Sequence, residues 1–470
     1  MDNVKLFGSG SGAGLAGQLA YDTLISVDPV TLKPVMRLAK SLDSSPDARV
    51  WTIKLRPQVV FSDGTPLDAA AVVANWDRHK IPALASVCLT IASGLGSYVA
   101  RDTSTVVITL PEARVAFRNQ LAGCLGQIES PTAVAKYGAN YGTSPETTVG
   151  AGPFLLKEWA RGSQMTWARN PTYWDKPRPY LDSMVVKPVN DTNQKFVAFQ
   201  AGQGDVANFS STSTQIAGLV ESTGAKIFGY PSVGGGADVA FNQKAPGLDD
   251  VRIRTALVLA TDPEDLNLKA AGGTATLVET YFVKGSPQYN PKVRQVSNNL
   301  KQAQKLVDEY VAEKGPVNLS FLLTESLTSW GQAQVQQWNR LNGLTVQLDV
   351  VPAPNAQSRL TVGDWQMAVT AHAASDPEAL NTLLHSTSRS NVIKYSNPTV
   401  DAALTQLRGE TDAKKQYALY TTITKEFLDD AAVVYWFRAL LPTVIRKGVS
   451  GIAPYNGANP DFAQISLAKQ

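Results

Sequence analysis

Alternating apolar and polar residues in the first quarter of the chain predict β-strands that bury one face. The stretch 51–55 alternates in this way, and the stretch 105–110 does so again before a proline ends it. Between them, an Asp-Gly pair at 63–64 predicts a tight turn, because glycine reaches backbone conformations that other residues avoid. A helix is then predicted from about Asp68 to Lys80, with Asp68 as its N-cap.

Apolar residues three or four positions apart predict helices in the second half of the chain. One of these helices leads through Asn342-Gly343, which we expect to end it, into an alternating strand at 344–350. An apolar run at 433–437 predicts a further strand. Helices and strands mix along the whole length, so the fold class is α/β or α+β. The helical positions are Ile253, Leu257 and Ala260; Val335, Trp338 and Leu341; Val400, Leu404 and Leu407; and Tyr420, Ile423 and Phe427.

Three consecutive glycines, Gly234 to Gly236, stand before the strand-like stretch 239–242. Glycine allows large changes of backbone angle, so the segment is a candidate hinge. The alternative is an ordinary flexible loop, which composition alone favours.

Length and charge narrow the class of protein. At roughly 150 residues per domain, a chain of 470 residues predicts about three domains or lobes. The 43 Lys and Arg residues nearly balance the 40 Asp and Glu residues, which argues against nucleic acid or an anionic membrane as the main partner. No apolar run is long enough to span a membrane. The residues after Met1 do not resemble a signal peptide, so we expect a cytoplasmic protein or one whose targeting segment has been removed.

The cysteines and histidines leave alternatives open. Cys88 and Cys124 are the only cysteines, which fits one disulfide in an oxidising compartment or two buried thiols. His79, at a helix end, is predicted to be a capping or surface residue. His372 lies between an apolar strand and a turn, where a ligand contact and a structural role are equally expected.

Motifs of catalysis and of cofactor binding are missing from the sequence. There is no His-Glu-x-x-His, no Cys-x-x-Cys and no Gly-x-Ser-x-Gly, so neither a metal site nor a serine hydrolase is supported. The glycine–serine run at 8–12 lacks the Lys-Ser/Thr of a phosphate-binding loop. Paired carboxylates of a glycoside hydrolase meet in space and not in sequence, so the sequence does not test them. We expect no cofactor and no metal.

A series of short motifs, in a fixed order along nearly the whole chain, resembles a known family. The motifs are Ala20-Tyr21-Asp22-Thr23-Leu24; the stretch Trp51 to Arg78; Gly150-Ala151-Gly152-Pro153-Phe154 with Arg169-Asn170-Pro171-Thr172-Tyr173-Trp174; Gln200-Ala201-Gly202 with Gly204-Asp205-Val206; Phe241-Asn242 with Asp250-Val251-Arg252-Ile253-Arg254; and Tyr395-Ser396-Asn397-Pro398 with Asp401. In these segments the chain is similar to the solute-binding proteins of bacterial ABC importers. The group it resembles is family 5, with its dipeptide-, oligopeptide- and nickel-binding members.

The resemblance implies a two-lobed periplasmic-binding-protein-like fold of type II, with an extra subdomain in the first lobe. Lobe I would span 1–235, with an inserted subdomain at about 30–149, and lobe II would span 236–435. The stretch 436–470 would return to lobe I, and the triglycine segment gains weight as a hinge. The two crossings between lobes are expected near 236–242 and 434–438.

The resemblance also implies a transport role and no enzymatic activity. A monomer would capture a small solute or short peptide by closing its lobes and would deliver it to ABC permease subunits. It would be periplasmic or extracellular, with the export signal trimmed; many members are lipoproteins, although no cysteine lies near Met1. A hydrolase on a similar scaffold is the alternative of another class.

The family pattern suggests where the ligand binds, and here the chain departs from peptide binders. In those proteins an aspartate shortly before the Asp/Glu-Pro turn pairs with the peptide's amino terminus, whereas this chain has Ala373 there. A buried ammonium without a carboxylate is costly, so an anionic or neutral non-peptide solute is favoured and a peptide is the alternative. Asp376 could substitute for the missing carboxylate or could form the turn. The candidate contacts are Ser11, Gly12, Asn242, Tyr281, Phe282, His372, Ser375, Asp376, Trp436 and Arg438. Core packing is the alternative for Trp436 and the favoured role for Tyr281 and Phe282, and a surface ion pair is the alternative for Arg438.

Overall fold

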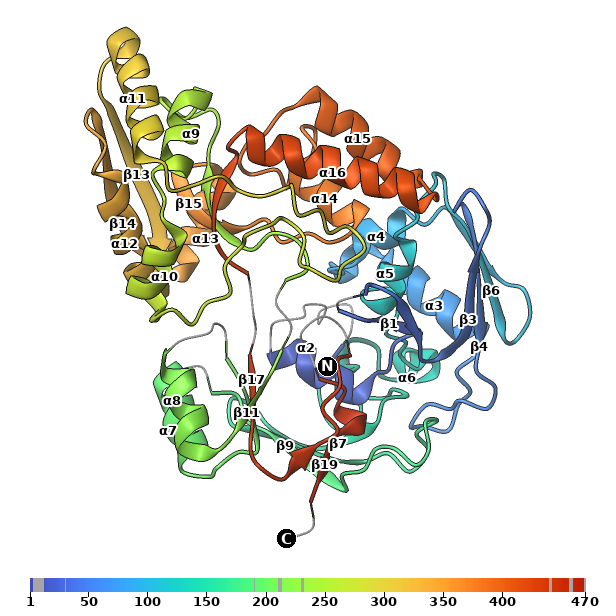
Figure 1. Ribbon diagram of the computed structural model, residues 1–470. Coiled ribbons are helices and arrows are strands. Elements are labelled where there is room, and N and C mark those ends of the chain that lie inside the picture. The colour runs from blue at the N-terminus through green and yellow to red at the C-terminus, as the bar shows by residue number, and fades with distance from the viewer. Residues whose placement is uncertain are drawn as a thin grey trace. The chain divides into compact units, whose positions relative to one another are not determined.

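The computed structural model describes residues 1–2, 12–29, 31–189, 191–209, 214–229, 232–438, 442–455 and 460–468 (Figure 1). Its contacts divide the chain into two compact units. Unit 1 comprises Met1–Phe209, Leu219–Tyr230 and Pro442–Gln470, and unit 2 comprises Ser210–Gly218 and Pro231–Leu441. The predicted crossings at 236–242 and 434–438 therefore fall inside unit 2, near its first and last residues. That the two units act as closing lobes stays a prediction.

The first part of unit 1 is an antiparallel sheet of order β3-β4-β6-β5 with helices packed against it. The predicted alternation is confirmed in β4, where Trp51, Ile53 and Leu55 are buried in the core. The elements are β1 (Ile25–Val27), β2 (Pro34–Met36), β3 (Ala39–Ser44), β4 (Val50–Leu55), α3 (Ala69–His79), α4 (Leu89–Ser93), β5 (Ser97–Ala100), β6 (Thr105–Thr109), α5 (Phe117–Ala122) and α6 (Pro131–Tyr137).

The predicted turn and helix after β4 are confirmed in detail. Gly64 adopts a φ of 83°, which the Asp-Gly turn requires. The carboxylate of Asp68 accepts a hydrogen bond from the Ala71 backbone N–H at 2.9 Å and so caps α3. The buried face of the helix includes Val72 and Trp76.

The rest of unit 1 consists of small sheets that the C-terminal stretch completes. Strand β17 pairs antiparallel with both β10 and β11, although more than 200 residues separate it from them. The elements are α2 (Gly12–Ala20), β7 (Phe154–Ala160), β8 (Gln164–Arg169), β9 (Ser183–Val186), α7 (Thr192–Gln200), β10 (Val206–Asn208), α8 (Thr214–Thr223), β11 (Lys226–Phe228), β17 (Thr443–Ile445), β18 (Val449–Ser450) and β19 (Ser466–Leu467).

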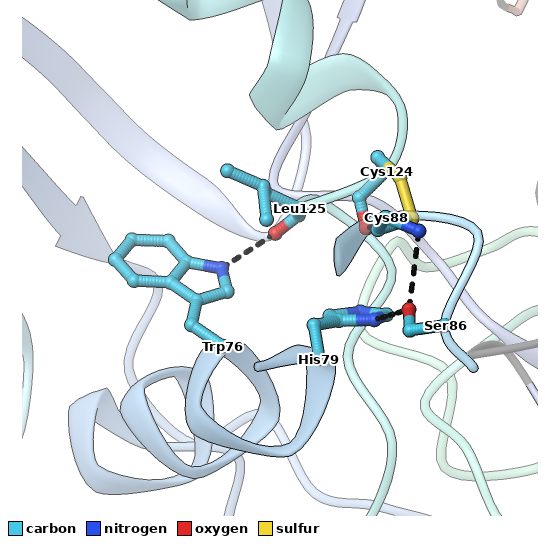
Figure 2. Close-up of a disulfide and its surroundings, with 6 residues drawn as sticks. All are labelled: Trp76, His79, Ser86, Cys88, Cys124 and Leu125. Carbon is cyan, nitrogen blue, oxygen red and sulfur yellow. Dashed lines mark hydrogen bonds between the residues drawn. A yellow bond between two sulfur atoms is a disulfide. The ribbon is translucent and has the colours of Figure 1, made fainter. Parts of the chain in front are cut away.

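Cys88 and Cys124 form a disulfide, with their Cα atoms 5.8 Å apart (Figure 2). The imidazole of His79 lies beside it, with Nδ1 2.8 Å from the Ser86 hydroxyl oxygen, and that oxygen accepts a hydrogen bond from the Cys88 backbone N–H. His79 is only 1% exposed, so its prediction as a capping or surface residue is wrong. Segments distant in sequence bury it, and the helical pattern alone does not reveal them.

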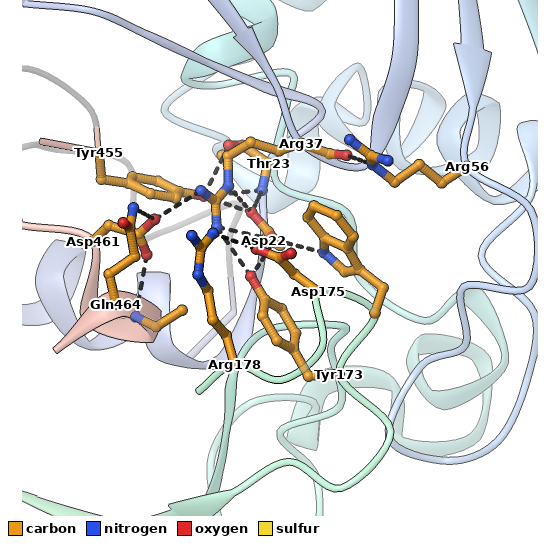
Figure 3. Close-up of polar contacts among 12 residues, drawn as sticks. Asp22, Thr23, Arg37, Arg56, Tyr173, Asp175, Arg178, Tyr455, Asp461 and Gln464 are labelled. Carbon is orange, nitrogen blue, oxygen red and sulfur yellow. Dashed lines mark hydrogen bonds and ion pairs between the residues drawn. The ribbon is translucent and has the colours of Figure 1, made fainter. Parts of the chain in front are cut away.

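A buried ion-pair network ties the C-terminal stretch to the N-terminal part of unit 1 (Figure 3). The Arg37 guanidinium donates to Asp22 at 2.6 Å and to Asp461 at 3.0 Å, and it lies over the ring of Tyr455. Asp22 also accepts hydrogen bonds from the Tyr455 hydroxyl and from the indole N–H of Trp174. The Ala20–Leu24 motif therefore serves to hold distant segments together.

Unit 2 is built on a five-stranded sheet of order β14-β13-β15-β12-β16. Strand β13 is parallel to β14 and β15, whereas β12 is antiparallel to both of its neighbours, β15 and β16. Helices α15 and α16 lie side by side, as do α9 and α11 (Figure 1). The elements are β12 (Ala237–Phe241), α9 (Val251–Leu259), α10 (Pro263–Ala271), α11 (Leu300–Lys314), β13 (Val317–Thr324), α12 (Thr328–Trp338), β14 (Leu344–Val351), α13 (Ala353–Val362), β15 (Met367–Ala371), α14 (Pro377–Leu384), α15 (Pro398–Gly409), α16 (Ala413–Asp429) and β16 (Val433–Phe437).

The predicted helices and strands of the second half are present, with one boundary corrected. Helix α12 ends at Trp338 with Asn339 as its C-cap, so Asn342-Gly343 does not end the helix as predicted. The Asn339 side chain bonds the backbone of Val346 in both directions and so fixes the turn into β14. Among the described residues, no helix combines the length and the apolar character that crossing a bilayer requires.

Candidate functional site

Three chain segments meet at one edge of the unit 2 sheet. Ala237, the first residue of β12, lies opposite Ala371, the last residue of β15, and opposite Phe437, the last residue of β16. Because β12 is antiparallel to both strands, the triglycine segment before it meets the residues that follow β15 and β16. His372 and Arg438, far apart in sequence, are thus brought to the same edge.

The triglycine segment is packed tightly between the other two segments. A Cβ atom on Gly234 would stand 2.0 Å from the Ala374 carbonyl oxygen, and one on Gly235 would stand 2.0 Å from that of His372. On Gly236 it would stand 2.2 Å from the Phe437 carbonyl oxygen. All three glycines are buried, so the interpretation as an ordinary flexible loop is wrong. The hinge role stays a prediction.

His372 is paired with a buried carboxylate. Its backbone N–H donates to Asp238 at 2.7 Å, and its Nδ1 lies 3.1 Å from both oxygens of that carboxylate. The Thr370 hydroxyl also donates to Asp238, at 2.6 Å. Asp238 is fully buried and His372 is 2% exposed, whereas the flanking Ala371 and Ala373 are exposed. His372 therefore has a structural partner, and its Nε2 has no hydrogen-bond partner among the residues that the structure describes.

Two tyrosine hydroxyls converge on the carbonyl oxygen of His372. Tyr435 donates to it at 3.1 Å and Tyr281 at 3.4 Å, and the two rings meet edge to face. Burial raises the pKa of both phenols, so both remain protonated donors. Phe282 packs beside them against Tyr281 and Tyr420. Tyr281 is buried at this edge, where it supports the backbone of His372, and its contact with a ligand stays a prediction.

Arg438 is buried and donates only to backbone carbonyls. Its Nη1 lies 3.2 Å from each of the carbonyl oxygens of Ser232, Gly235 and Tyr281, and its Nη2 donates to that of Thr280 at 2.5 Å. It is 4% exposed, so the predicted surface ion pair is wrong. Burial lowers the pKa of the guanidinium, although Tyr435 and Glu279 act in the opposite direction. Arginine nevertheless stays charged in proteins.

The charge of Arg438 is only partly offset, because Glu279 raises its pKa without forming an ion pair with it. No ion pair joins Arg438 to an acidic residue in the described part of the chain. Its Nε donates no hydrogen bond to any described residue. A guanidinium carries five N–H donors in a fixed plane. Arg438 therefore holds together the segment before β12 and the segment around Tyr281. It also keeps N–H donors for a further acceptor, such as a planar oxyanion.

A long segment without regular structure supplies residues that sequence patterns missed. Between α10 and α11, the Gln288 side chain donates to the Ser375 carbonyl oxygen at 2.9 Å. The Gln288 amide oxygen and the Ser286 hydroxyl are buried and have no hydrogen-bond partner among the described residues. No periodicity or motif marks these two residues, so only the length of the segment could have drawn attention to them.

The remaining predicted contacts have structural roles or lie elsewhere. The Asn242 side chain donates to the Trp365 carbonyl oxygen at the opposite end of β12. Trp436 is packed in the core, where it stacks on Trp330 and donates to Gln334. Asp376 caps α14 through the backbone N–H groups of Glu378 and Ala379, so the turn interpretation is confirmed. Ser11 lies outside the described residues, and Gly12 begins α2 in unit 1.

The described residues contain no group of three or more His, Cys, Asp or Glu side chains placed to hold a metal ion. The polar groups at this edge are the buried Arg438 guanidinium, one imidazole nitrogen and the His372 backbone, whose carbonyl oxygen both tyrosines hold.

Comparison with known proteins gives a consistent family. A family model described as bacterial extracellular solute-binding proteins, family 5 Middle, matches residues 33–393. The chain is 25% identical over 445 residues to the probable D,D-dipeptide-binding periplasmic protein DdpA of Escherichia coli, covering 91% of this chain and 83% of the relative. It is 26% identical over 455 residues to the periplasmic oligopeptide-binding protein OppA of Escherichia coli, covering 91% and 82%. It is 26% identical over 457 residues to the glutathione-binding protein GsiB of Pectobacterium atrosepticum, covering 92% and 85%.

Solved structures share the fold. The ABC transporter substrate-binding protein CtaP of Listeria monocytogenes superposes with a TM-score of 0.85 at 23% identity, covering 100% of this chain and 96% of that one. The binding protein AgaA of A. tumefaciens, in complex with agropinic acid, gives 0.80 at 21% identity with the same coverage. Both similarities concern the fold, and they confirm the predicted type II binding-protein class.

Proposed function

The chain belongs to the bacterial extracellular solute-binding proteins of family 5, and from this premise we propose that its solute carries an acidic group held by Arg438 and lacks a free ammonium group. Proteins of this family are periplasmic or extracellular and deliver a ligand to an ABC importer. The part that we propose concerns the chemistry of the ligand and the residues that recognise it.

The buried guanidinium of Arg438, which has more N–H donors than the four carbonyls use, is the observation on which the proposal rests. A buried positive charge without a carboxylate is costly unless a bound partner compensates it. Four backbone carbonyls hold the guanidinium in place, so little ordering would be needed when a ligand carboxylate binds. Bidentate pairing with a planar oxyanion is the contact for which arginine is best suited.

The carboxylates near Ala373 argue against an ammonium group. Asp238 already accepts hydrogen bonds from His372 and Thr370, and Asp376 accepts two at the start of α14. The alanine at position 373 adds no acceptor. A ligand ammonium at this edge would compete with these bonds, whereas a carboxylate would meet Arg438.

The ligands named for the relatives support an acidic group on the solute. The same ligands also define the competing proposal, a peptide binder. D,D-dipeptides, oligopeptides and glutathione are bound by the relatives, and each of these molecules carries a carboxylate. Each also carries an amino group, so a peptide binder is the competing proposal. The ammonium group is therefore the feature that separates the two.

Capture would follow from closure of the two units as lobes. A ligand shifts an open–closed equilibrium only by its difference in affinity for the two states, and full conversion takes about 5 kcal/mol. A small acid held by paired polar groups could supply this difference. The relatives are transport proteins, so we expect ligand-dependent stabilisation of the fold without turnover.

Three matched peptides test the proposal by isothermal titration calorimetry. Dialanine carries both charges, N-acetyl-dialanine lacks the ammonium, and dialanine amide lacks the carboxylate. We expect the acetylated peptide to bind at least as well as dialanine, and the amide to bind at least about tenfold more weakly than either. Dialanine binding more than about tenfold tighter than its acetylated form would favour the peptide binder instead. Small acids and neutral sugars, screened in parallel, extend the comparison beyond peptides.

A further inference from the structure

A cavity of about 210 Å³ lies in unit 2, beside the start of α9 and the end of α11. One wall is the loop that follows β12, so the cavity is at the opposite end of this strand from Arg438. Its volume is below the roughly 300–1,000 Å³ of sites for drug-sized ligands, which suits a small solute. The lining residues are Pro246, Gly247, Asp249, Asp250, Tyr310 and Lys314.

The two walls of the cavity are held together by Arg252. Its guanidinium donates to both carboxylate oxygens of Glu313, at 2.9 and 3.0 Å, and to Asp250 at 2.8 Å. Glu313 belongs to α11, whereas Asp250 is the N-cap of α9, and these two helices lie side by side (Figure 1). The cavity is therefore preformed, so little ordering would be needed when a ligand binds.

The loop wall is also fixed in place. Leu248 is fully buried, and its carbonyl oxygen accepts a hydrogen bond at 2.8 Å from Arg254, which is itself buried. The next backbone N–H, that of Asp249, donates to the Ala245 carbonyl oxygen at 3.0 Å. Asp249 therefore occupies a defined position at the cavity.

Three polar groups that line the cavity are left without a partner. The Asp249 carboxylate, the Lys314 ammonium and the Tyr310 hydroxyl make no hydrogen bond or ion pair with any described residue. Asp250, by contrast, is already paired with Arg252. Asp249 and Lys314 are exposed, so a solute can reach them. Two opposite charges that line one cavity without pairing leave a gap that a molecule with both charges can bridge.

The Tyr310 hydroxyl is an independent sign of a ligand. Tyr310 is only 9% exposed and its ring packs in the core of unit 2, so the hydroxyl cannot swing away from the cavity. Burial raises the pKa of this phenol, and the charges of Asp249 and Asp250 act in the same direction. The hydroxyl therefore stays protonated near these carboxylates. Buried polar groups are nearly always paired, so this hydroxyl requires a partner inside the cavity.

We propose that this cavity binds a small zwitterion, such as a free amino acid. Asp249 would hold its ammonium group, Lys314 its carboxylate, and the Tyr310 hydroxyl would supply a further hydrogen bond. A solute with a single charge would be attracted by one of the two charged residues and repelled by the other. The site does not depend on the acidic ligand proposed for Arg438, because none of its residues belongs to the edge at which Arg438 lies.

Alanine, propionate and ethylamine test the site as a matched set, since propionate lacks the ammonium of alanine and ethylamine lacks its carboxylate. Nuclear magnetic resonance of the Asp249 and Tyr310 backbone amides reports binding at this cavity and not at Arg438. We expect alanine to shift these amides in a saturable way, and each analogue to bind at least about tenfold more weakly. No saturable shift with alanine, or equal affinity for the three molecules, would overturn the proposal.

The double variant Asp249→Asn and Lys314→Met should raise the dissociation constant for alanine at least about tenfold. Its matched control is Glu264→Gln with Lys301→Met, which removes one exposed acid and one exposed lysine of the same unit and should leave the constant unchanged. Native affinity in the double variant, or an equal loss in the control, would contradict the proposed contacts.

Tyr310→Phe removes only the hydroxyl and so separates a binding role from a structural one. It should weaken alanine binding by about two- to tenfold. Because the hydroxyl has no partner in the ligand-free protein, its removal should leave the melting temperature unchanged or raise it. A fall in the melting temperature, or unchanged alanine binding, would show that the hydroxyl serves no ligand and would overturn its place in the site.

Discussion

Gly235 lies directly against the carbonyl oxygen of His372, so close that a Cβ atom on Gly235 would stand 2.0 Å from that oxygen. The same hypothetical atom would stand 2.8 Å from the Tyr435 hydroxyl oxygen, and the backbone φ at Gly235 is +53°. Glycine is therefore required twice, once for the backbone angle and once for the close approach. The chain crossing beside Arg438 depends on a residue without a side chain.

Gly235→Ala is expected to destabilise unit 2 by on the order of 4 kcal/mol, because the strained backbone angle and the clash with a backbone oxygen add to each other. Urea unfolding measures the loss. Gly273→Ala is the matched control in the same unit: its φ is +79°, but nothing lies within 4 Å of the added atom. The control should lose only about 1 kcal/mol, and equal losses in the two variants would show that the close approach is unimportant.

Arg37→Met is expected to destabilise unit 1 by roughly 3–5 kcal/mol, because it leaves Asp22 and Asp461 buried without their shared cation. Hydrogen exchange at Tyr455 and at 461–464 should rise before exchange at β4, since the network holds Tyr455 and Asp461. Arg101→Met, an exposed arginine, serves as the control. Unchanged exchange in the Arg37 variant would show that the stretch is held by other contacts.

The same network predicts a pH dependence with a definite sign. Burial acts to raise the pKa of Asp22, but the Arg37 charge and hydrogen bonds from Arg37, Trp174 and Tyr173 outweigh it, so the pKa is lowered. A carboxyl with a lowered pKa stabilises the fold above its unfolded value, and this stability is lost as the pH falls through the folded value. The gap in unfolding free energy between the native chain and Arg37→Met should therefore narrow below about pH 4. A constant gap down to pH 2 would contradict this.

The elements that the sequence predicts well are those whose cause is local. The N-cap of α3 and the turn at Gly64 depend on residues within a few positions, and both are confirmed. The apolar faces of α15 and α16 are likewise buried as their spacing predicts. Local rules were sufficient for these elements, but the equally local Asn342-Gly343 signal did not mark the end of α12.

The contacts that the sequence left open or did not indicate involve partners far apart in sequence. Trp436 is a core residue because Trp330 and Gln334 come to meet it, and Arg438 is buried because four carbonyls from two distant segments surround it. Gln288 reaches Ser375 from a segment without periodicity. Sheet order and register decide these contacts, and neither can be obtained from the spacing of apolar residues along one segment.

Replacing both Cys88 and Cys124 by serine is expected to destabilise unit 1 by about 4 kcal/mol, since a cross-link over a separation of 36 residues removes much of the freedom of the unfolded chain. Thermal unfolding with and without dithiothreitol measures the effect. The reductant should lower the melting temperature of the native chain and leave the double variant unchanged. Equal melting temperatures for the native chain under both conditions, once thiol titration shows reduction, would contradict a stabilising disulfide.

Burial next to this disulfide lowers the pKa of His79 to about 4, and the neighbouring Arg78 charge acts in the same direction. The folded protein therefore resists protonation of this imidazole until the pH approaches 4, whereas the unfolded chain takes up the proton near pH 6.5. Between these values the unfolded state binds more protons. Stability must then fall as the pH falls, by roughly 3 kcal/mol across the whole interval.

His79→Asn should remove this part of the pH dependence, because asparagine cannot take up the proton yet can still hydrogen bond near the Ser86 hydroxyl. Urea unfolding followed from pH 7 to pH 4.5 is the measurement, with the slope of unfolding free energy against pH as the result. His385→Asn is the control, since His385 lies in unit 2 with a side chain 20% exposed, and its slope should match that of the native chain. A native slope near zero in this interval, or an equal slope in the His79 variant, would mean that the imidazole is protonated in the folded protein.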